Sequence, residues 1–202
     1  MPDRSREKTQ ILFVHGAGEG AYAVDVKLAA DLRDELGPRY RVHCPRMPKE
    51  AAPDAAVWKR RLAKEIAAMG NGAILVGHSA GATVAVVAVA ERAIKQRLAG
   101  LFLISAPFCG DGGWQIEGFD APADLKERIP AGVPIFFYQG RDDETVPIAH
   151  IGLYARAIPR AVVRRLSGRN HQLNDDLSEV AFDIKRLEAI QTRPSAPSSR
   201  RR

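Results

Sequence analysis

The chain has 202 residues, of which 46% are apolar and 27% charged, and its formal net charge is +6. These proportions are typical of one globular domain, since a chain of about 150 to 250 residues buries a substantial core. They exclude a collagen-like, coiled-coil or wholly disordered protein. The longest apolar run, 84–90, is far shorter than the roughly 20 residues that a membrane span needs. Residues 1–10 lack the apolar core of a signal peptide.

Cysteine content and charge distribution limit the remaining classes. Cys44 and Cys109 are too few for a disulfide framework and too far apart for a metal site, so we expect a cytoplasmic protein. Four arginines lie in 193–202, which we expect to form a flexible basic tail, and we expect a flexible N-terminus over 1–8. The folded body is then nearly neutral and gives no reason to expect a nucleic-acid partner.

Short apolar runs alternate with helix-length segments along the chain. In chain order we predict a strand at 11–14, a helix at 23–36, a strand at 40–44, a helix at 55–69, a strand at 73–76, a buried helix at 80–98, strands at 101–104 and 133–138, a helix at 148–158, a strand at 161–166 and a helix at 175–190. This alternation predicts a single α/β domain over 9–192, with about six mostly parallel strands and helices on both faces. In such sheets ligands bind beyond the carboxyl ends of the strands.

One connection breaks the alternation. Residues 107–132 are rich in Gly, Pro and Asp, with a short helix expected at 123–128. We expect this excursion to form a minimal lid or a pocket wall at the carboxyl edge of the sheet.

Residues 77–81 (GHSAG) match the pattern G-x-S-x-G between an apolar strand and an apolar helix. A serine nucleophile in this context occupies a sharp, strained turn, and glycines remove side chains that would clash there. We therefore predict that Ser79 is a nucleophile. The side chain of His78 is expected to point away from it and to pack.

A serine nucleophile needs a base, and the base needs an acid that fixes its tautomer. The chain order Ser, acid, His is expected, with acid and base each following a strand. His171 follows the strand at 161–166, and Asp142, Asp143 and Glu144 follow the strand at 133–138. Position alone leaves these three carboxylates as alternatives.

The loop after the first strand is expected to supply a backbone donor for an oxyanion. We assign the oxyanion hole to the backbone N–H groups of Ala17 and Ala80. His15 is expected to order this loop. The same loop, 16–21 (GAGEGA), also fits a dinucleotide-binding turn, and Arg46 could meet a 2′-phosphate. An NADP-binding oxidoreductase is therefore an alternative, but it leaves the placement of the serine, aspartate and histidine unexplained.

With these motifs the chain resembles the α/β-hydrolase superfamily over nearly all of 9–190. In that superfamily the acid lies in G-x-x-D-x-x-V-P, and residues 140–147 (GRDDETVP) match it with Asp143. The small size, together with Asp54 and Trp58, is similar to the compact retinoblastoma-binding serine hydrolases and their bacterial relatives. The resemblance implies a sheet that starts at the superfamily's third strand, and a shallow site.

We therefore predict an esterase-like serine hydrolase, without metal or cofactor, that cleaves carboxylic ester, thioester or small amide bonds. Ser79 forms the acyl-enzyme, His171 moves the proton and Asp143 orients the imidazole. The expected partner is a small acyl substrate, with no nucleic acid and no membrane span. Candidate pocket residues, each equally consistent with plain core, are Phe108, Trp114, Phe119 and Ile148. A binding protein that keeps the fold with a silent site is the second alternative.

Overall fold

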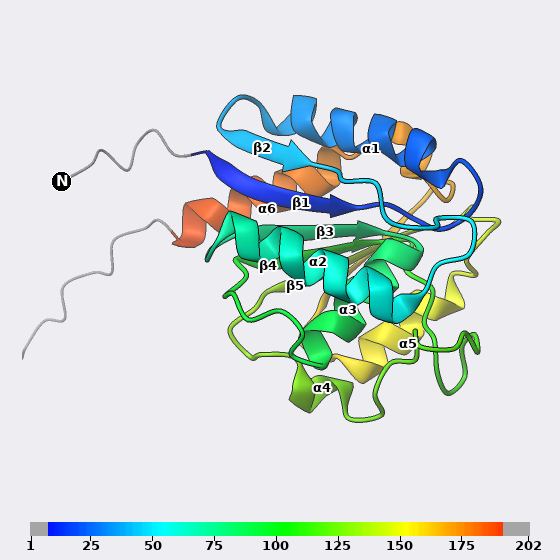
Figure 1. Ribbon diagram of the computed structural model, residues 1–202. Helices are drawn as coiled ribbons and strands as arrows, with labels where there is room; N and C mark the ends of the chain where they lie inside the picture. The colour runs from blue at the N-terminus through cyan, green and yellow to red at the C-terminus, as the bar shows by residue number, and fades with distance from the viewer. Residues whose placement is uncertain (1–7, 192–202) are drawn as a thin grey trace, which may run out of the picture.

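The computed structural model describes residues 8–191 (Figure 1), so the predicted tails at 1–8 and 193–202 lie outside it, apart from Lys8. Six strands form one sheet in the order β2-β1-β3-β4-β5-β6, and every neighbouring pair is parallel. The strands are β1 (Thr9–Val14), β2 (Tyr40–His43), β3 (Ile74–His78), β4 (Gly100–Ile104), β5 (Ile135–Gly140) and β6 (Val162–Leu166). The predicted α/β fold is confirmed.

Helices cover both faces of this sheet (Figure 1). One layer holds α1 (Ala21–Leu36) and α6 (Ser178–Gln191), and the other holds α2 (Ala55–Met69), α3 (Ala80–Ala90), α4 (Leu125–Arg128) and α5 (Ala149–Ala157). A short 3-10 helix, η2 (Leu173–Asp175), precedes α6. Within residues 8–191 no helix has the length and apolarity that a membrane crossing requires.

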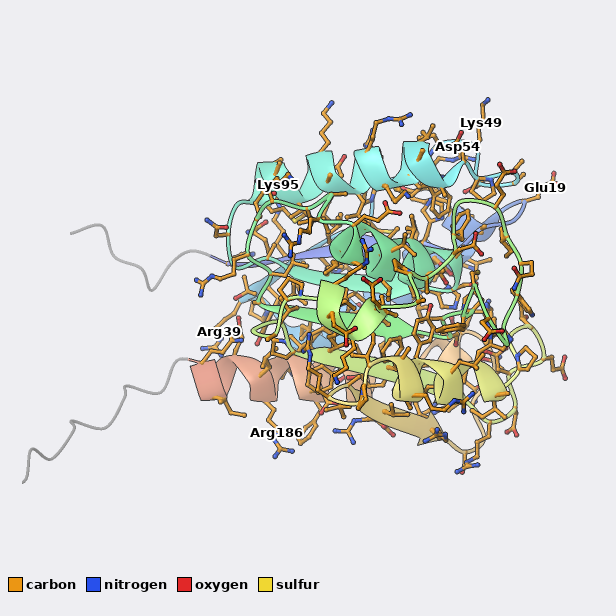
Figure 2. All side chains as sticks on the ribbon, turned by 90° about the horizontal axis from the view of Figure 1, so that it is seen from below. Glu19, Arg39, Lys49, Asp54, Lys95 and Arg186 are labelled. Atoms are coloured by element: carbon orange, nitrogen blue, oxygen red, sulfur yellow. The ribbon has the colours of Figure 1, made fainter. Side chains whose placement is uncertain are left out.

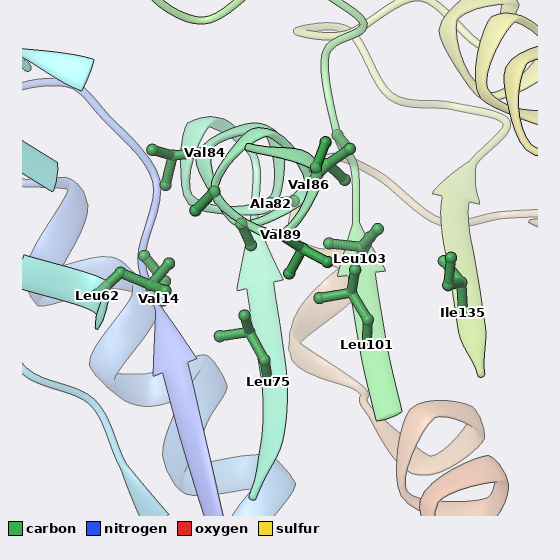
Figure 3. Packing of buried hydrophobic residues seen from close by; sticks show 14 of the residues in the cluster. Val14, Leu62, Leu75, Ala82, Val84, Val86, Val89, Leu101, Leu103 and Ile135 are labelled. Carbon is green, nitrogen blue, oxygen red and sulfur yellow. The ribbon is translucent and has the colours of Figure 1, made fainter. Parts of the chain in front are cut away.

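The strands divide their side chains between two cores because successive residues point to opposite faces. Ile11 and Phe13 of β1 pack in the layer of α1 and α6, whereas Leu12 and Val14 pack in the layer of α2 and α3. Figure 3 shows this second layer, with Val89 of α3 beside Leu101 of β4. Ala82 and Val84 of the first turns of α3 belong to the same core as Val14 of β1, which packs the start of α3 against the sheet.

The helix predicted over 80–98 is shorter in the structure and ends at Ala90. Arg92 takes a left-handed backbone conformation with φ 57°, and its N–H donates to the carbonyl of Val89 at 3.1 Å. Residues 81–90 are buried throughout, whereas 91–97 contains four charged side chains. Because charged side chains need solvent, the chain turns out of the buried layer there and the helix ends. The prediction was wrong for 91–98.

Candidate active site

A cavity of about 230 Å³ lies at the carboxyl edge of the sheet, between the loops that follow β1 and β3. The strand order reverses at this point, because β2 and β3 lie on opposite sides of β1, and ligands of parallel sheets bind at such switch points. Figure 2 labels Glu19 at this end of the molecule. The cavity is lined by Gly16, Ala17, Gly18, Glu19, Ala21, Val24, Asp25, His78, Ser79, Thr145, His171 and Gln172.

Ser79 occupies a tight turn between β3 and α3, with φ 51° and ψ −125°. The flanking glycines allow this turn. A Cβ on Gly77 would lie 2.6 Å from Cα of Ala82, and a Cβ on Gly81 would lie 2.3 Å from the carbonyl oxygen of Val14. Both contacts are with backbone atoms, so side chains at these positions would force the turn open. Within residues 8–191 the Ser79 hydroxyl makes no hydrogen bond, and it shares the cavity with His171.

The structure brings Asp143 and His171 together. Nδ1 of His171 lies 3.0 Å from Oδ1 and 2.9 Å from Oδ2 of Asp143. The other two carboxylates considered for this position, Asp142 and Glu144, are exposed. The remaining Nε2 of His171 is the ring atom available to a partner in the cavity.

The Asp143 carboxylate is held by several donors. Its oxygens accept the backbone N–H groups of Thr145 at 2.9 Å and Val146 at 2.8 Å, and the side-chain amide of Gln139 at 2.6 Å. Burial acts to raise the pKa of Asp143, but the hydrogen bonds from His171 and the Val146 amide lower it below its ordinary value. The carboxylate is therefore ionised and fixed in orientation.

The loop after β1 holds, beside the cavity, an amide for which residues 8–191 supply no acceptor. The N–H of Gly16 donates to Oδ2 of Asp25 at 2.7 Å, and the N–H of Gly18 donates to the carbonyl of Glu50 at 2.7 Å. The amide between them, that of Ala17, has no acceptor within residues 8–191, and neither has the amide of Ala80 at the start of α3. Both residues adjoin Ser79, since Ala17 lines its cavity and Ala80 follows it in the chain.

His15 is fully buried beneath this loop. Its Nδ1–H donates to the carbonyl of Gly16 at 2.6 Å, and its Nε2 accepts the N–H of Met47 at 2.8 Å. Burial lowers the pKa of His15, so the ring is neutral and uses both nitrogens to order the loop, as its position predicts.

None of the four predicted pocket residues lines the cavity beside Ser79. Phe108 and Phe119 are buried in the hydrophobic core, and Trp114 and Ile148 pack against it while partly buried. The segment 107–132 folds on itself here, since the N–H of Trp114 donates to the carbonyl of Phe108 at 2.9 Å. Burial in the core stabilises these apolar side chains, and no residue of 107–132 reaches the cavity.

Several residues at the site escaped the sequence analysis, among them Asp25, Gln139, Thr145 and Gln172. Asp25 did carry a signal, because it shares the buried stripe of α1 with Leu28, Ala29, Leu32 and Leu36. A single carboxylate on an otherwise apolar stripe points to a specific buried partner.

Elsewhere in residues 8–191, a second hollow lacks this chemistry. A larger hollow of about 760 Å³ lies among residues 89–98 and 126–133, at the opposite end of the molecule, where Figure 2 labels Lys95. Its lining includes neither serine nor histidine. Among residues 8–191 no group of three or more His, Cys, Asp or Glu side chains is placed to hold a metal ion.

A family model described as the alpha/beta hydrolase family matches residues 11–197. A serine hydrolase involved in carbazole degradation (CarC) is similar in structure, with a TM-score of 0.71, 16% identity and coverage of 91% of this chain and 92% of that one. The ydeN gene product of B. subtilis gives a TM-score of 0.69 at 17% identity and covers 90% and 100% of the two chains.

Est1E from Butyrivibrio proteoclasticus, solved with ferulic acid bound, gives a TM-score of 0.64 at 18% identity, over 95% of this chain and 92% of that one. A search of curated proteins found no match. At these identities the solved structures show the fold, and the family model covers most of the chain. The chain therefore belongs to the alpha/beta hydrolase family.

Proposed function

We propose that this protein is a serine hydrolase that cleaves a carboxylic ester, thioester or small amide bond through an acyl-enzyme on Ser79. The observation that carries the proposal is the hydrogen-bonded pair of Asp143 and His171, whose imidazole lines the same cavity as the strained Ser79. Membership of the alpha/beta hydrolase family and the hydrolases among its structural neighbours support a hydrolase in general.

The proposed reaction begins with the proton of Ser79. Asp143 binds the Nδ1–H of His171, which leaves Nε2 as the acceptor for that proton while Oγ of Ser79 attacks the substrate carbonyl carbon. The amides of Ala17 and Ala80 donate hydrogen bonds to the oxyanion that forms. The tetrahedral intermediate then expels the alcohol, thiol or amine, which takes the proton from His171.

Water completes the cycle. It gives a proton to Nε2 of His171 and attacks the acyl carbon, and the second tetrahedral intermediate releases a carboxylic acid while the proton returns to Oγ of Ser79. The cavity has a volume of about 230 Å³, and its lining combines small side chains such as Ala17 and Val24 with the polar Glu19 and Gln172. A cavity of this volume favours a small acyl group or one that extends into solvent.

Finer parts of the proposal stay predictions. These are the relationship to the compact retinoblastoma-binding serine hydrolases, the cytoplasmic location and the lid role of 107–132, a segment with no residue in the lining of the cavity beside Ser79. An NADP-binding role has less support, because Arg46 lies 2.9 Å from the Glu50 carboxylate and the loop at Gly16 packs on Ser79.

The Ser79→Ala variant tests the proposal. We expect kcat for p-nitrophenyl acetate to fall by about 10⁵- to 10⁶-fold, because a catalytic triad acts as a unit. Ser167→Ala is the matched control, since Ser167 is an exposed serine in the turn after β6. A loss of only a few-fold in Ser79→Ala would refute the acyl-enzyme on Ser79.

A further inference from the structure

Asp25 and His78 form a second buried carboxylate–imidazole pair, which the proposed reaction does not use. Oδ2 of Asp25 lies 2.7 Å from Nδ1 of His78, and the two side chains are 2% and 3% exposed. Burying two ionisable groups costs more free energy than burying apolar side chains of similar size, unless their hydrogen bonds are complete. The pair is therefore an unusual feature of this core.

The loop that carries the proposed oxyanion amide and the main chain of the proposed base both contact this pair. Oδ2 of Asp25 accepts the N–H of Gly16 at 2.7 Å, directly before Ala17 in the chain. Nε2 of His78 lies 3.1 Å from the backbone carbonyl oxygen of His171. The hydroxyl of Ser105 donates to that same oxygen at 2.7 Å, so both lone pairs of the His171 carbonyl are used.

Hydrogen-bond chemistry determines the charge of His78. A carboxylate and a backbone carbonyl only accept, so both ring nitrogens of His78 donate and the ring is an imidazolium. Burial acts to lower the pKa of His78, but the charge and hydrogen bond of Asp25 raise it above its ordinary value. Burial acts to raise the pKa of Asp25, but His78 lowers it. The two groups form a buried ion pair.

We propose that Asp25 and His78 are positioning residues that fix the Ala17 amide and the main chain of His171 relative to Ser79 before substrate binds. The inference rests on the proposed serine hydrolase function. The ring of His78 lies 4.8 Å from the ring of His171, centroid to centroid, so the restraint acts on the immediate neighbour of the proposed base. Displacement of a reacting group by about 1 Å costs on the order of 10²-fold in rate, which is the effect expected when this restraint is lost.

Asp25→Asn removes the charge with little change of volume. The new amide oxygen can still accept the N–H of Gly16, but His78 without its counter-ion keeps one ring proton and cannot donate to both partners. We expect kcat per reactive serine to fall by about 10- to 100-fold while KM changes less than about threefold, because both side chains border the cavity but are only 2% and 3% exposed and offer substrate little surface. Titration with a fluorophosphonate counts the molecules that have a reactive serine, so misfolded protein does not enter the calculated kcat.

Two substitutions of His78 separate its two hydrogen bonds. His78→Gln places a donor near the position of Nε2 and can still reach the His171 carbonyl, whereas His78→Asn places one near Nδ1 and keeps only the contact with Asp25. We expect His78→Gln to retain several times more kcat per reactive serine than His78→Asn. Equal kcat in these two variants would contradict the positioning of His171 by His78, even if Asp25→Asn does not fold.

Asp183→Asn is the control for loss of a buried carboxylate. Asp183 is 2% exposed and binds Arg164 and the Tyr138 hydroxyl without lining the cavity. We expect this variant to lower the melting temperature and leave kcat per reactive serine unchanged. The same behaviour in Asp25→Asn would overturn the inference. A wild-type protein that neither reacts with fluorophosphonate nor hydrolyses esters would instead refute the proposed function.

Discussion

At the residue scale, the backbone of Ser79 is strained. A non-glycine residue in such a conformation, here with φ 51°, costs on the order of 1–3 kcal/mol and persists only where its surroundings hold it. Here the surroundings are the first turn of α3 and the end of β1, which approach so closely that a Cβ on Gly81 would lie 2.3 Å from the Val14 carbonyl oxygen and 2.4 Å from that of His15.

Gly81→Ala tests this close approach. We expect the free energy of unfolding in urea to fall by about 1–3 kcal/mol, because the added methyl group meets backbone atoms and the core cannot absorb it without strain. Gly152→Ala in α5 is the matched control, since its nearest contact is the end of the Arg156 side chain at 3.8 Å. That change should stabilise the protein by about 0.5–1 kcal/mol. Gly81→Ala with wild-type stability would contradict the packing of the turn.

Position after a strand was sufficient to expect Ser79, His171 and the carboxylates at 142–144 at one edge of the sheet, because parallel strands end at the same edge. The choice of Asp143 among the three carboxylates came from the resemblance to the family motif. The pairing of Asp25 with His78 was not predictable in this way. Their positions are 53 residues apart in the chain, and no local pattern connects a helix residue with the elbow. Only the packing of α1 beside the loop after β1 brings them together.

At the scale of elements, helices with clear end signals were predicted best. The bounds of α2 are as predicted, because Oδ1 of Asp54 accepts the N–H of Val57 at 2.9 Å at its start and Gly70, with φ 79°, ends it. β5 was predicted at 133–138 but runs from Ile135 to Gly140, since Gln139 and Gly140 pair with Arg165 and Leu166 of β6. The end of this strand depends on a neighbour that the local pattern does not reveal.

The segment 107–132 shows a second limit of element prediction. An aromatic residue in an irregular segment has the same sequence pattern whether it lines a pocket or fills the core. Phe108 packs edge-on against Tyr154 of α5 at 4.9 Å between ring centroids, and that contact depends on the position of α5. Core burial could therefore not be distinguished from a pocket role before the fold was known.

At the scale of the whole molecule, the Asp25–His78 ion pair makes stability depend on pH. The folded-state pKa of His78 lies above its ordinary 6.5. The contribution of the His78 charge to the free energy of unfolding is therefore complete below about pH 6.5 and is lost as pH rises through the folded-state pKa. The pKa of Asp25 lies below its ordinary 3.8. The contribution of the Asp25 charge to the free energy of unfolding is therefore complete above about pH 3.8 and is lost as pH falls through the folded-state pKa. The pair therefore contributes most between these limits.

Thermal unfolding of the wild type and His78→Gln from pH 5 to pH 10 tests this linkage. We expect the stability advantage of the wild type to be largest near pH 5–6 and to shrink at higher pH, by at most about 1.4 kcal/mol per pH unit. An advantage that stays constant over this range would show that the pair is not ionised.

On the scale of the whole molecule, we propose that the fold activates one serine among the eight in the chain. The most direct measurement is the intact mass of the wild type and of Ser79→Ala after incubation with a fluorophosphonate, which phosphonylates an activated serine with loss of fluoride. We predict a single adduct on the wild type and none on Ser79→Ala. No adduct on the wild type, or the same adduct on both proteins, would contradict the account.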